Sequence, residues 1–223
     1  METVVSIFLV LLLSVFSAEA KTKHPSRKPK PKPAVPAVKK TIRNSAFSTV
    51  VIDAGHGGHD FGGIPQNLIP EKGAALDVAL RLNTALQRAG FKTILTRRDD
   101  TFIPLGTRAA IANAHPEAIF VCIHFDASPR AAACGISTHY ASPGEAPLAG
   151  FIQRHLMTTT DGTNRGIKNA RFYVLRKTTG RAVLVECGFL TNPHDVALAQ
   201  RAPYRQKLAE QICAGIVEYR NSL

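Results

Sequence analysis

The chain has 223 residues, of which 45% are hydrophobic, and it carries 28 Lys and Arg against 16 Asp and Glu. This length is enough for one domain with a sizeable core, and the hydrophobic fraction excludes a wholly disordered chain. The formal net charge of +12 suggests a nucleic-acid-binding protein only if the charge lies on the folded part. Residues 21–44 hold nine of the bases and no acid, so most of the excess charge belongs to one segment.

Residues 1–20 are typical of a secretory signal peptide. Val4–Phe16 is an apolar stretch too short to span a bilayer comfortably, and Ala18-Glu19-Ala20 matches an A-x-A cleavage pattern. Glu2 stands where a basic residue is usual, so an uncleaved membrane anchor is the alternative. In both cases we expect an exported protein.

Residues 21–44 interleave proline with lysine and contain no aromatic residue. Such a segment buries no apolar surface, repels itself and extends as polyproline II. We interpret it as a solvated linker, with adhesion to an anionic cell envelope as the sharper alternative. Nucleic-acid binding is not expected, because the chain is exported and the segment has no aromatic side chains on which bases could stack.

Residues 45–223 predict one folded α/β domain. Expected strands are Thr49–Ile52, Phe91–Thr96, Ala118–Ile123, Gly135–Tyr140, Phe172–Arg176 and Ala182–Glu186. Expected helices are Glu71–Ala89, Leu105–Ala114, Pro147–Met157, a short helix starting at Asn192-Pro193, and Pro203–Tyr219. Strands that alternate with helices indicate a mostly parallel twisted sheet of about six strands, with helices on both faces.

The four cysteines do not form a C-x-x-C pair, so a thiolate metal site is not indicated. Cys122 and Cys187 lie inside apolar runs, where a buried free thiol is the commoner state. We therefore expect free thiols.

Two histidines and a glutamate stand at the ends of predicted strands. His56 lies in a glycine-rich turn after the first strand, and the turn has neither the Gly-Lys-Ser/Thr ending nor the G-x-G-x-x-G register of a phosphate loop. His124 directly follows the strand Ala118–Ile123. Glu186 closes the last strand, where an unpaired charge would be costly. The carboxyl ends of parallel strands are where open α/β sheets bind ligands, so these side chains should converge.

Glu71 adds a second carboxylate to this edge. It lies four residues before Ala75 and seven before Val78, on the same helical face, so it should point toward the sheet. Two imidazoles and one carboxylate make a zinc site with its fourth position open; zinc lowers the pKa of bound water to about 7 and polarises a carbonyl. We predict His56, Glu71 and His124 as ligands of one zinc ion, and Glu186 as the catalytic carboxylate that takes and returns a proton.

The chain resembles the zinc-dependent N-acetylmuramoyl-L-alanine amidases over about Thr49–Arg220. The motifs that carry the resemblance are Ile52-Asp53-Ala54-Gly55-His56-Gly57-Gly58, Glu71-Lys72, Leu95-Thr96-Arg97, Ile123-His124 and Val185-Glu186-Cys187-Gly188-Phe189-Leu190-Thr191-Asn192. The resemblance implies hydrolysis of the amide between muramic acid and the stem peptide of peptidoglycan, with the same four residue roles. The chain departs from the family pattern at Phe125-Asp126 and at Cys187, which are not among the predicted zinc ligands.

The same resemblance sets our expectations about partners and place. We expect a monomer acting on peptidoglycan, in the periplasm or, as the alternative, secreted and associated with the cell wall. Some members carry an inserted helix that plugs the site until an activator displaces it. Only 24 residues separate Tyr140 from Arg165, so we predict no plug here, although an envelope activator could not be identified from the sequence. Arg176, at the end of a predicted strand, is our candidate for binding a stem-peptide carboxylate.

Two other functions remain open at this point. A zinc peptidase could attack an amide within the stem peptide with the same metal centre. A non-catalytic wall-binding module is the third possibility, but binding alone would not need Glu186 beside a metal.

Overall fold

The computed structural model describes residues 46–63, 69–158 and 163–223. The predicted signal peptide over residues 1–20 and the basic linker over residues 21–44 lie outside this part. The strands are β1 (Thr49–Ala54), β2 (Lys92–Leu95), β3 (Ile119–Asp126), β4 (Ile136–Tyr140), β5 (Asn164–Asn169) and β6 (Arg181–Phe189). The helices are α1 (Glu71–Arg88), α2 (Leu105–Asn113), α3 (Ala146–Met157), α4 (Tyr173–Lys177), α5 (Pro193–Ala199) and α6 (Ala202–Asn221), with a 3-10 turn at Pro143–Glu145.

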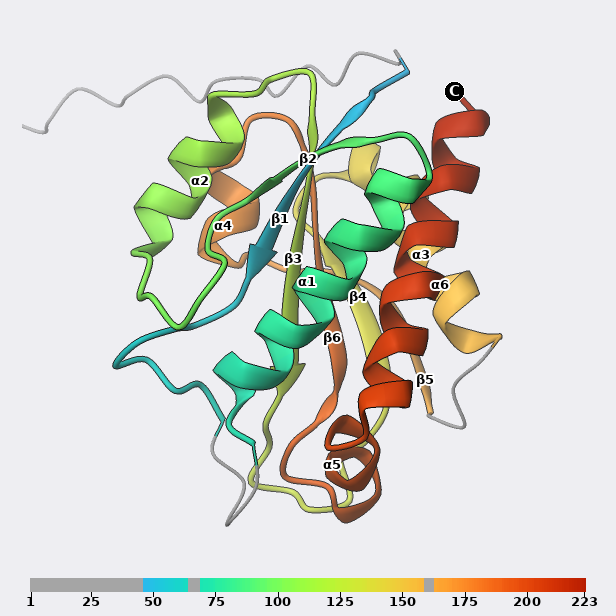
Figure 1. Cartoon of the computed structure of the whole chain (residues 1–223). Helices are drawn as coiled ribbons and strands as arrows, with labels where there is room; N and C mark the ends of the chain where they lie inside the picture. The colour runs from blue at the N-terminus through green and yellow to red at the C-terminus, as the bar shows by residue number, and fades with distance from the viewer. Residues whose placement is uncertain (1–45, 64–68, 159–162) are drawn as a thin grey trace, which may run out of the picture. The chain divides into compact units, whose positions relative to one another are not determined.

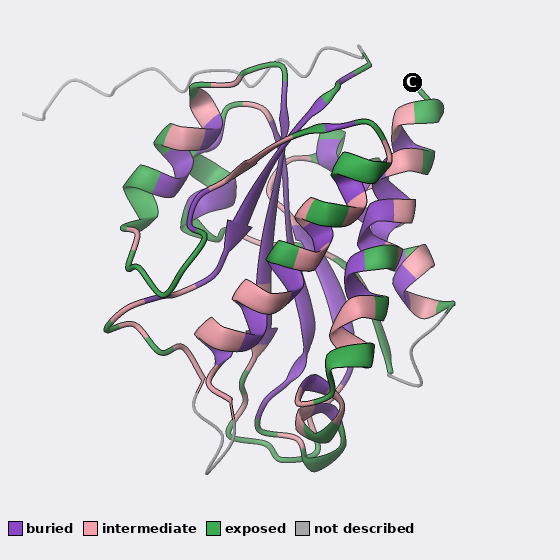
Figure 2. Ribbon diagram, in the orientation of Figure 1, coloured by how far each residue is buried: buried purple, intermediate pink, exposed green. Residues whose placement is uncertain are grey.

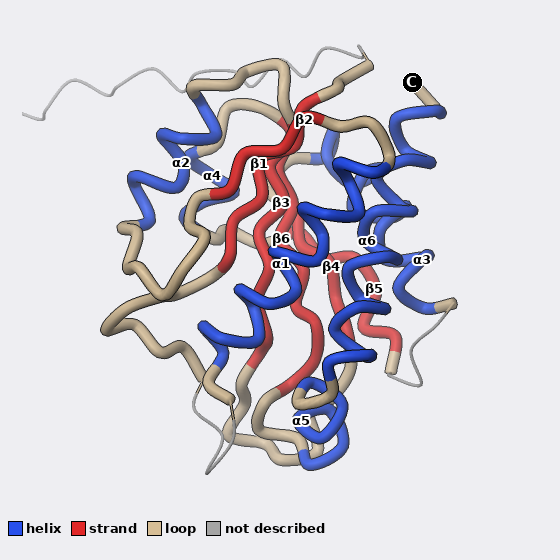
Figure 3. The backbone as a smooth tube through the Cα atoms, in the orientation of Figure 1, coloured by secondary structure: helices blue, strands red, loops and turns tan. Residues whose placement is uncertain are grey.

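The described strands form one sheet in the order β2-β1-β3-β6-β4-β5. The first four strands in this order are parallel to one another, β4 is antiparallel to β6, and β5 is parallel to β4. The carboxyl ends of β1, β3 and β6 therefore meet at one edge. Figure 3 shows the loops that follow these strands gathered at that end, together with the start of α1.

Helices cover both faces of the sheet, as predicted (Figure 1). On one face α1, α3 and α6 enclose the larger core, and on the other α2 and α4 enclose a smaller one. Every residue of β6 is buried, which is expected of a central strand with both faces covered. Figure 2 shows the same pattern, with buried strands between helices that bury only their inner sides.

The helix α1 begins and ends close to the predicted residues. Its apolar residues at helical spacing, Ala75, Val78, Leu82 and Leu86, have no exposed surface. The helix ends before Gly90, whose φ of 83° is readily adopted only by glycine, and the Gly90 amide donates to the Gln87 carbonyl. Burial of this stripe against the sheet aims the first turn of α1 at the carboxyl edge.

One predicted strand is wrong and one observed strand was missed. Residues 172–176 do not form a strand; they lie mostly in the short helix α4. Val174 and Leu175 are both buried on the same side, which consecutive residues in a strand could not achieve. The missed strand β5 is the outermost strand on one side of the sheet, is polar and contains Gly166. It therefore lacks the alternation of apolar and polar residues that identifies strands in a sequence.

All four cysteines lie in the described part and none is in a disulfide; Cys122 and Cys187 are buried. Among the described residues no helix is long and apolar enough to cross a membrane.

Candidate metal centre and active site

The loop after β1 presents His56 at the carboxyl edge of the sheet. His56 has a φ of 60°, in the left-handed region that few residues other than glycine occupy. The Gly55 amide donates to the Ile123 carbonyl of β3 (3.0 Å), which ties the loop to the neighbouring strand. The rings of His56 and His124 thereby come edge to face, with their centroids 4.8 Å apart.

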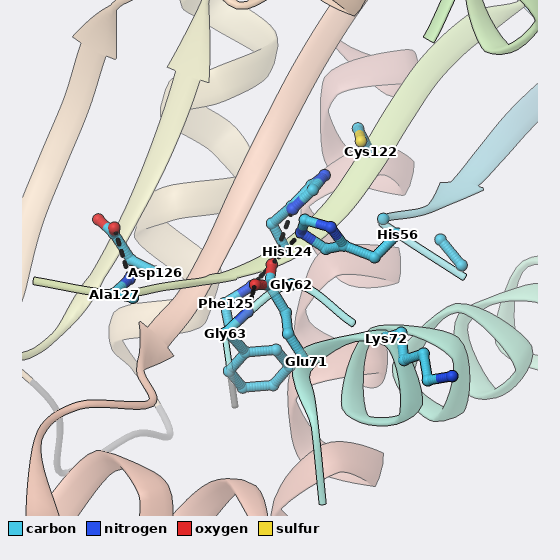
Figure 4. A network of polar contacts seen from close by, with 12 residues as sticks. His56, Gly62, Gly63, Glu71, Lys72, Cys122, His124, Phe125, Asp126 and Ala127 are labelled. Atoms are coloured by element: carbon cyan, nitrogen blue, oxygen red, sulfur yellow. Dashed lines mark hydrogen bonds and ion pairs between the residues drawn. The ribbon is translucent and has the colours of Figure 1, made fainter. Parts of the chain in front are cut away.

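Glu71, the first residue of α1, reaches between the two imidazoles (Figure 4). Its Oε1 lies 3.0 Å from Nε2 of His56 and 2.8 Å from Nδ1 of His124, and it accepts a hydrogen bond from the Phe125 amide (3.1 Å). Its Oε2 accepts from the Gly63 amide (2.8 Å). The side chain is only 6% exposed, so a desolvated carboxylate stands at the centre of the cluster.

The residues present fit a metal ion. The donor atoms of His56, Glu71 and His124 all lie within 4.8 Å of one another. Two imidazole nitrogens and one carboxylate oxygen form a ligand set of catalytic zinc sites. Burial opposes ionisation of Glu71, but the hydrogen bonds from His124 and His56 outweigh it and hold the pKa of this carboxyl well below its usual value. A fixed negative charge is therefore available to a divalent cation.

The two histidines respond to the same carboxylate. Burial acts to lower the pKa of each imidazole, yet the hydrogen bond and charge of Glu71 raise the pKa of both His56 and His124 above the usual value. The Glu71 carboxylate therefore favours positive charge at both imidazoles.

Asp60 orients His56, and the sequence did not identify it. Its Oδ1 lies 2.8 Å from Nδ1 of His56 and also accepts from the Gly62 amide (3.1 Å). A carboxylate on one ring nitrogen leaves the other nitrogen, Nε2, directed at the ligand cluster. A spacing of four residues indicates neighbouring side chains only in a helix. Residues 56–60 form a loop, so the spacing does not predict the contact between His56 and Asp60.

Glu186 lies next to His124, because β3 and β6 pair these two residues in register. The side chain is nearly buried, and its Oε2 has no hydrogen-bond partner among the described residues. Burial, partly offset by the charge of His124, raises the pKa of Glu186 to about 7. A carboxyl group with a pKa near neutrality can both accept and donate a proton.

The structure thus brings together the four side chains that the sequence predicted to converge. Arg176 differs, because it lies in the helix α4 and not at a strand end. It is exposed, and its Nε donates to the Arg171 carbonyl (3.0 Å). No contact described in the structure joins Arg176 to the four clustered residues, so its role in substrate binding stays a prediction.

Comparison with known proteins identifies the family. The model of the N-acetylmuramoyl-L-alanine amidase family matches residues 50–218. The chain belongs to this family. As a peptidoglycan amidase it is an enzyme of the cell wall, and such enzymes act outside the cytoplasm.

Named amidases are similar along most of the described chain. The N-acetylmuramoyl-L-alanine amidase LytC of Bacillus subtilis is 36% identical over 193 residues, which cover 82% of this chain and 39% of LytC. The amidase AmiA of Escherichia coli is 29% identical, over 81% of this chain and 78% of AmiA. The solved amidase of Clostridium difficile 630 superposes with a TM-score of 0.75 at 35% identity, over 80% of this chain and 99% of that one.

Proposed function

We propose that this amidase cleaves the bond between N-acetylmuramic acid and L-alanine with one zinc ion held by His56, Glu71 and His124, and with Glu186 as the proton carrier. The observation that carries the proposal is the convergence of His56, Glu71 and His124 within 4.8 Å, beside a buried carboxyl in register with His124. Zinc in such a site supplies a Lewis acid that polarises the scissile carbonyl and acidifies a water molecule.

The chain's own residues divide the remaining work. Asp60 fixes the orientation of the His56 ring through Nδ1, and the Phe125 and Gly63 amides hold the Glu71 carboxylate in place. Oε2 of Glu186, which has no hydrogen-bond partner in the part of the chain that the structure describes, can accept the proton of the attacking water and pass it to the leaving nitrogen. The buried position of Glu186 strengthens its hydrogen bonds to the attacking water and to the leaving nitrogen, because few other waters compete there.

A zinc peptidase acting within the stem peptide would use the same residues, so products must be identified. Purified protein is incubated with sacculi, and the released material is analysed by mass spectrometry. New L-alanine amino termini support the amidase, cuts inside the stem peptide support the peptidase, and binding without product supports a wall-binding module. Membership in the amidase family favours the first outcome.

The residues before the domain give this proposal a location. We assign residues 1–20 as a signal peptide, residues 21–44 as a basic linker and residues 45–223 as the catalytic domain. The basic charge of residues 21–44 favours an anionic envelope. Periplasmic location is preferred, with the secreted form as the alternative. Sequencing the amino terminus of the exported protein distinguishes cleavage from a retained anchor.

The proposal includes activity without an activator. The helix α3, which accounts for half of the 24 residues between Tyr140 and Arg165, packs against α6 and β4, which supports a structural role for it. The CwlD amidase of Clostridioides difficile, 28% identical, was solved in complex with the GerS lipoprotein. If this chain also needs a partner, the purified monomer will be inactive on sacculi. Full activity of the monomer alone supports the proposal.

Arg176 completes the predicted substrate contacts. If it binds a stem-peptide carboxylate, Arg176→Ala raises KM for muropeptides with free carboxyl groups and leaves KM for amidated ones unchanged. Equal KM values for the variant and the wild type remove this role.

A further inference from the structure

Two buried arginines, Arg97 and Arg108, hold the backbone of the segment that leads from β1 to His56. Arg108 donates from Nη1 to the Ala54 carbonyl (2.6 Å) and from Nη2 to the His56 carbonyl (2.6 Å). Its charge is paired with the buried Asp53 (2.8 Å), and its Nε donates to the Ile103 carbonyl (2.8 Å). These contacts fix the backbone of a loop whose central residue has an uncommon positive φ.

Arg97 connects this loop to the helix that carries Glu71. Its Nε donates to the Ala54 carbonyl (3.0 Å), and its Nη2 donates to both the Gly55 carbonyl (2.7 Å) and the Lys72 carbonyl (2.8 Å). Its Nη1 donates to the Asp99 carbonyl (2.9 Å). One rigid guanidinium therefore contacts the residue before His56 and the residue after Glu71.

The position of Arg97 is costly. The residue is 3% exposed, and no carboxylate lies within ion-pair distance of it in the part of the chain that the structure describes. Its charge is satisfied by backbone carbonyls, which offset the loss of hydration less well than a carboxylate would. Burial and the nearby Arg108 lower the pKa of this guanidinium. A hydrophobic side chain of similar volume could fill this space without the free-energy cost of removing a charge from water.

We infer that Arg97 is a positioning residue for metal binding: it sets the distance between His56 and Glu71 before the ion arrives. The four donor directions of a planar guanidinium match four carbonyls on three segments, which a lysine could not do. Arg108 supports the same loop through the Ala54 and His56 carbonyls. This inference rests on the proposed zinc site and adds the residue that preorganises it.

The test is a zinc titration of the variant Arg97→Lys, which keeps the charge and loses the fork of donors. Apo-protein is prepared with a chelator, and zinc affinity is measured against a competing chromophoric chelator. Outer-shell partners typically affect metal affinity 10- to 100-fold, so we expect Arg97→Lys to weaken zinc binding by about that factor. A dissociation constant within twofold of the wild-type value would overturn the inference.

Arg81→Lys is the matched control. Arg81 is a partly exposed arginine of α1, held by Asp77 (2.8 Å) and Gln206 (2.9 Å), and it has no described contact with His56, Glu71 or His124. We expect Arg81→Lys to bind zinc as tightly as the wild type. Equal weakening in both variants would show a general effect of arginine loss and would also overturn the inference.

Thermal unfolding separates positioning from ordinary stabilisation. Zinc raises Tm through its affinity for the folded state, so a positioning role predicts that the zinc-induced increase in Tm is smaller in Arg97→Lys. A purely structural role lowers the Tm of apo- and zinc-loaded protein equally and leaves that increase unchanged. If Arg97→Lys and Arg97→Gln are both unfolded without zinc, Arg97 is structural and the inference fails.

Failure of the inference is distinguishable from failure of the proposed function. Wild-type protein that binds no zinc would refute the metal site itself. Wild-type protein that binds zinc tightly, together with an unaffected Arg97→Lys, would refute only the role of Arg97.

Discussion

The backbone of Gly55 lies against the imidazole of His124, so closely that a Cβ at position 55 would stand 2.4 Å from Cε1 of the ring. Gly55 directly follows β1, and His124 lies in β3, which pairs in parallel with β1, so the contact stands where the two histidine rings come together. A glycine at this position is therefore required by the close approach of the His124 ring and not by its own backbone angles.

Gly55→Ala should disrupt the metal centre. The added methyl group must displace the His124 ring, because the nearest atoms are all in that ring. We expect zinc affinity and kcat/KM to fall at least tenfold, measured by chelator competition and by release of muropeptides. Gly150→Ala in α3 is the control, since nothing lies within 4 Å of a Cβ there and alanine is the better helix former. Unchanged zinc affinity in Gly55→Ala would contradict this account.

Glu186→Gln should abolish turnover without unfolding the protein. Loss of a positioned proton carrier typically costs 10²- to 10⁴-fold in kcat. Oε2 has no hydrogen-bond partner among the described residues, so the amide breaks no contact there and Tm should not fall. Glu210→Gln on the exposed side of α6 should keep wild-type kcat. Wild-type turnover by Glu186→Gln would exclude the proposed mechanism.

Metal removal should stop the reaction and reduce stability together. Dialysis against a chelator should eliminate muropeptide release, and stoichiometric zinc should restore it. At a free zinc concentration about 100 times Kd, binding adds about 2.7 kcal/mol to the free energy of unfolding. Calorimetry with and without zinc measures this increment. Activity that survives complete removal of metal, verified by elemental analysis, would be incompatible with the site described.

His139 should make the domain less stable in weak acid. Burial and the nearby charges of Lys168 and Arg165 lower its pKa from 6.5 to about 4. The unfolded chain therefore binds the proton more tightly, so this stability is fully present above pH 6.5 and is lost as the pH falls toward 4. The loss amounts to at most about 3 kcal/mol, at about 1.4 kcal/mol per pKa unit. Urea unfolding between pH 7 and pH 4 measures it.

His139→Gln is the comparison for this prediction, because glutamine keeps a polar side chain near Ser137, the present partner of the imidazole (3.0 Å), and cannot titrate. The free energy of unfolding of the variant should depend less on pH across this window. An identical pH dependence in both proteins would assign the acid sensitivity to other groups.

Local patterns in the sequence determined much of this structure. The stripe along α1 and the unbroken apolar runs of β3 and β6 each have one way to bury their surface, so their positions follow from periodicity. His124 and Glu186 were predictable because each stands at the end of an apolar run, Glu71 because it lies on the apolar face of a helix, and His56 because it follows a strand in a glycine-rich turn. Hydrophobic periodicity did not predict α4 or β5. Both segments are short, and contacts with residues distant in the chain decide their structure.

Only the tertiary structure decided how the site is held. Arg97 and Arg108 reach carbonyls of the His56 loop that lie 42 to 54 residues away in the sequence, and no spacing in the sequence records those contacts. Asp60 is likewise recognisable only once the loop is folded. The sequence by itself determined which side chains could bind a metal, because donor chemistry is local to a residue. The relative positions of those donors depend on long-range hydrogen bonds, which exist only after the sheet has formed.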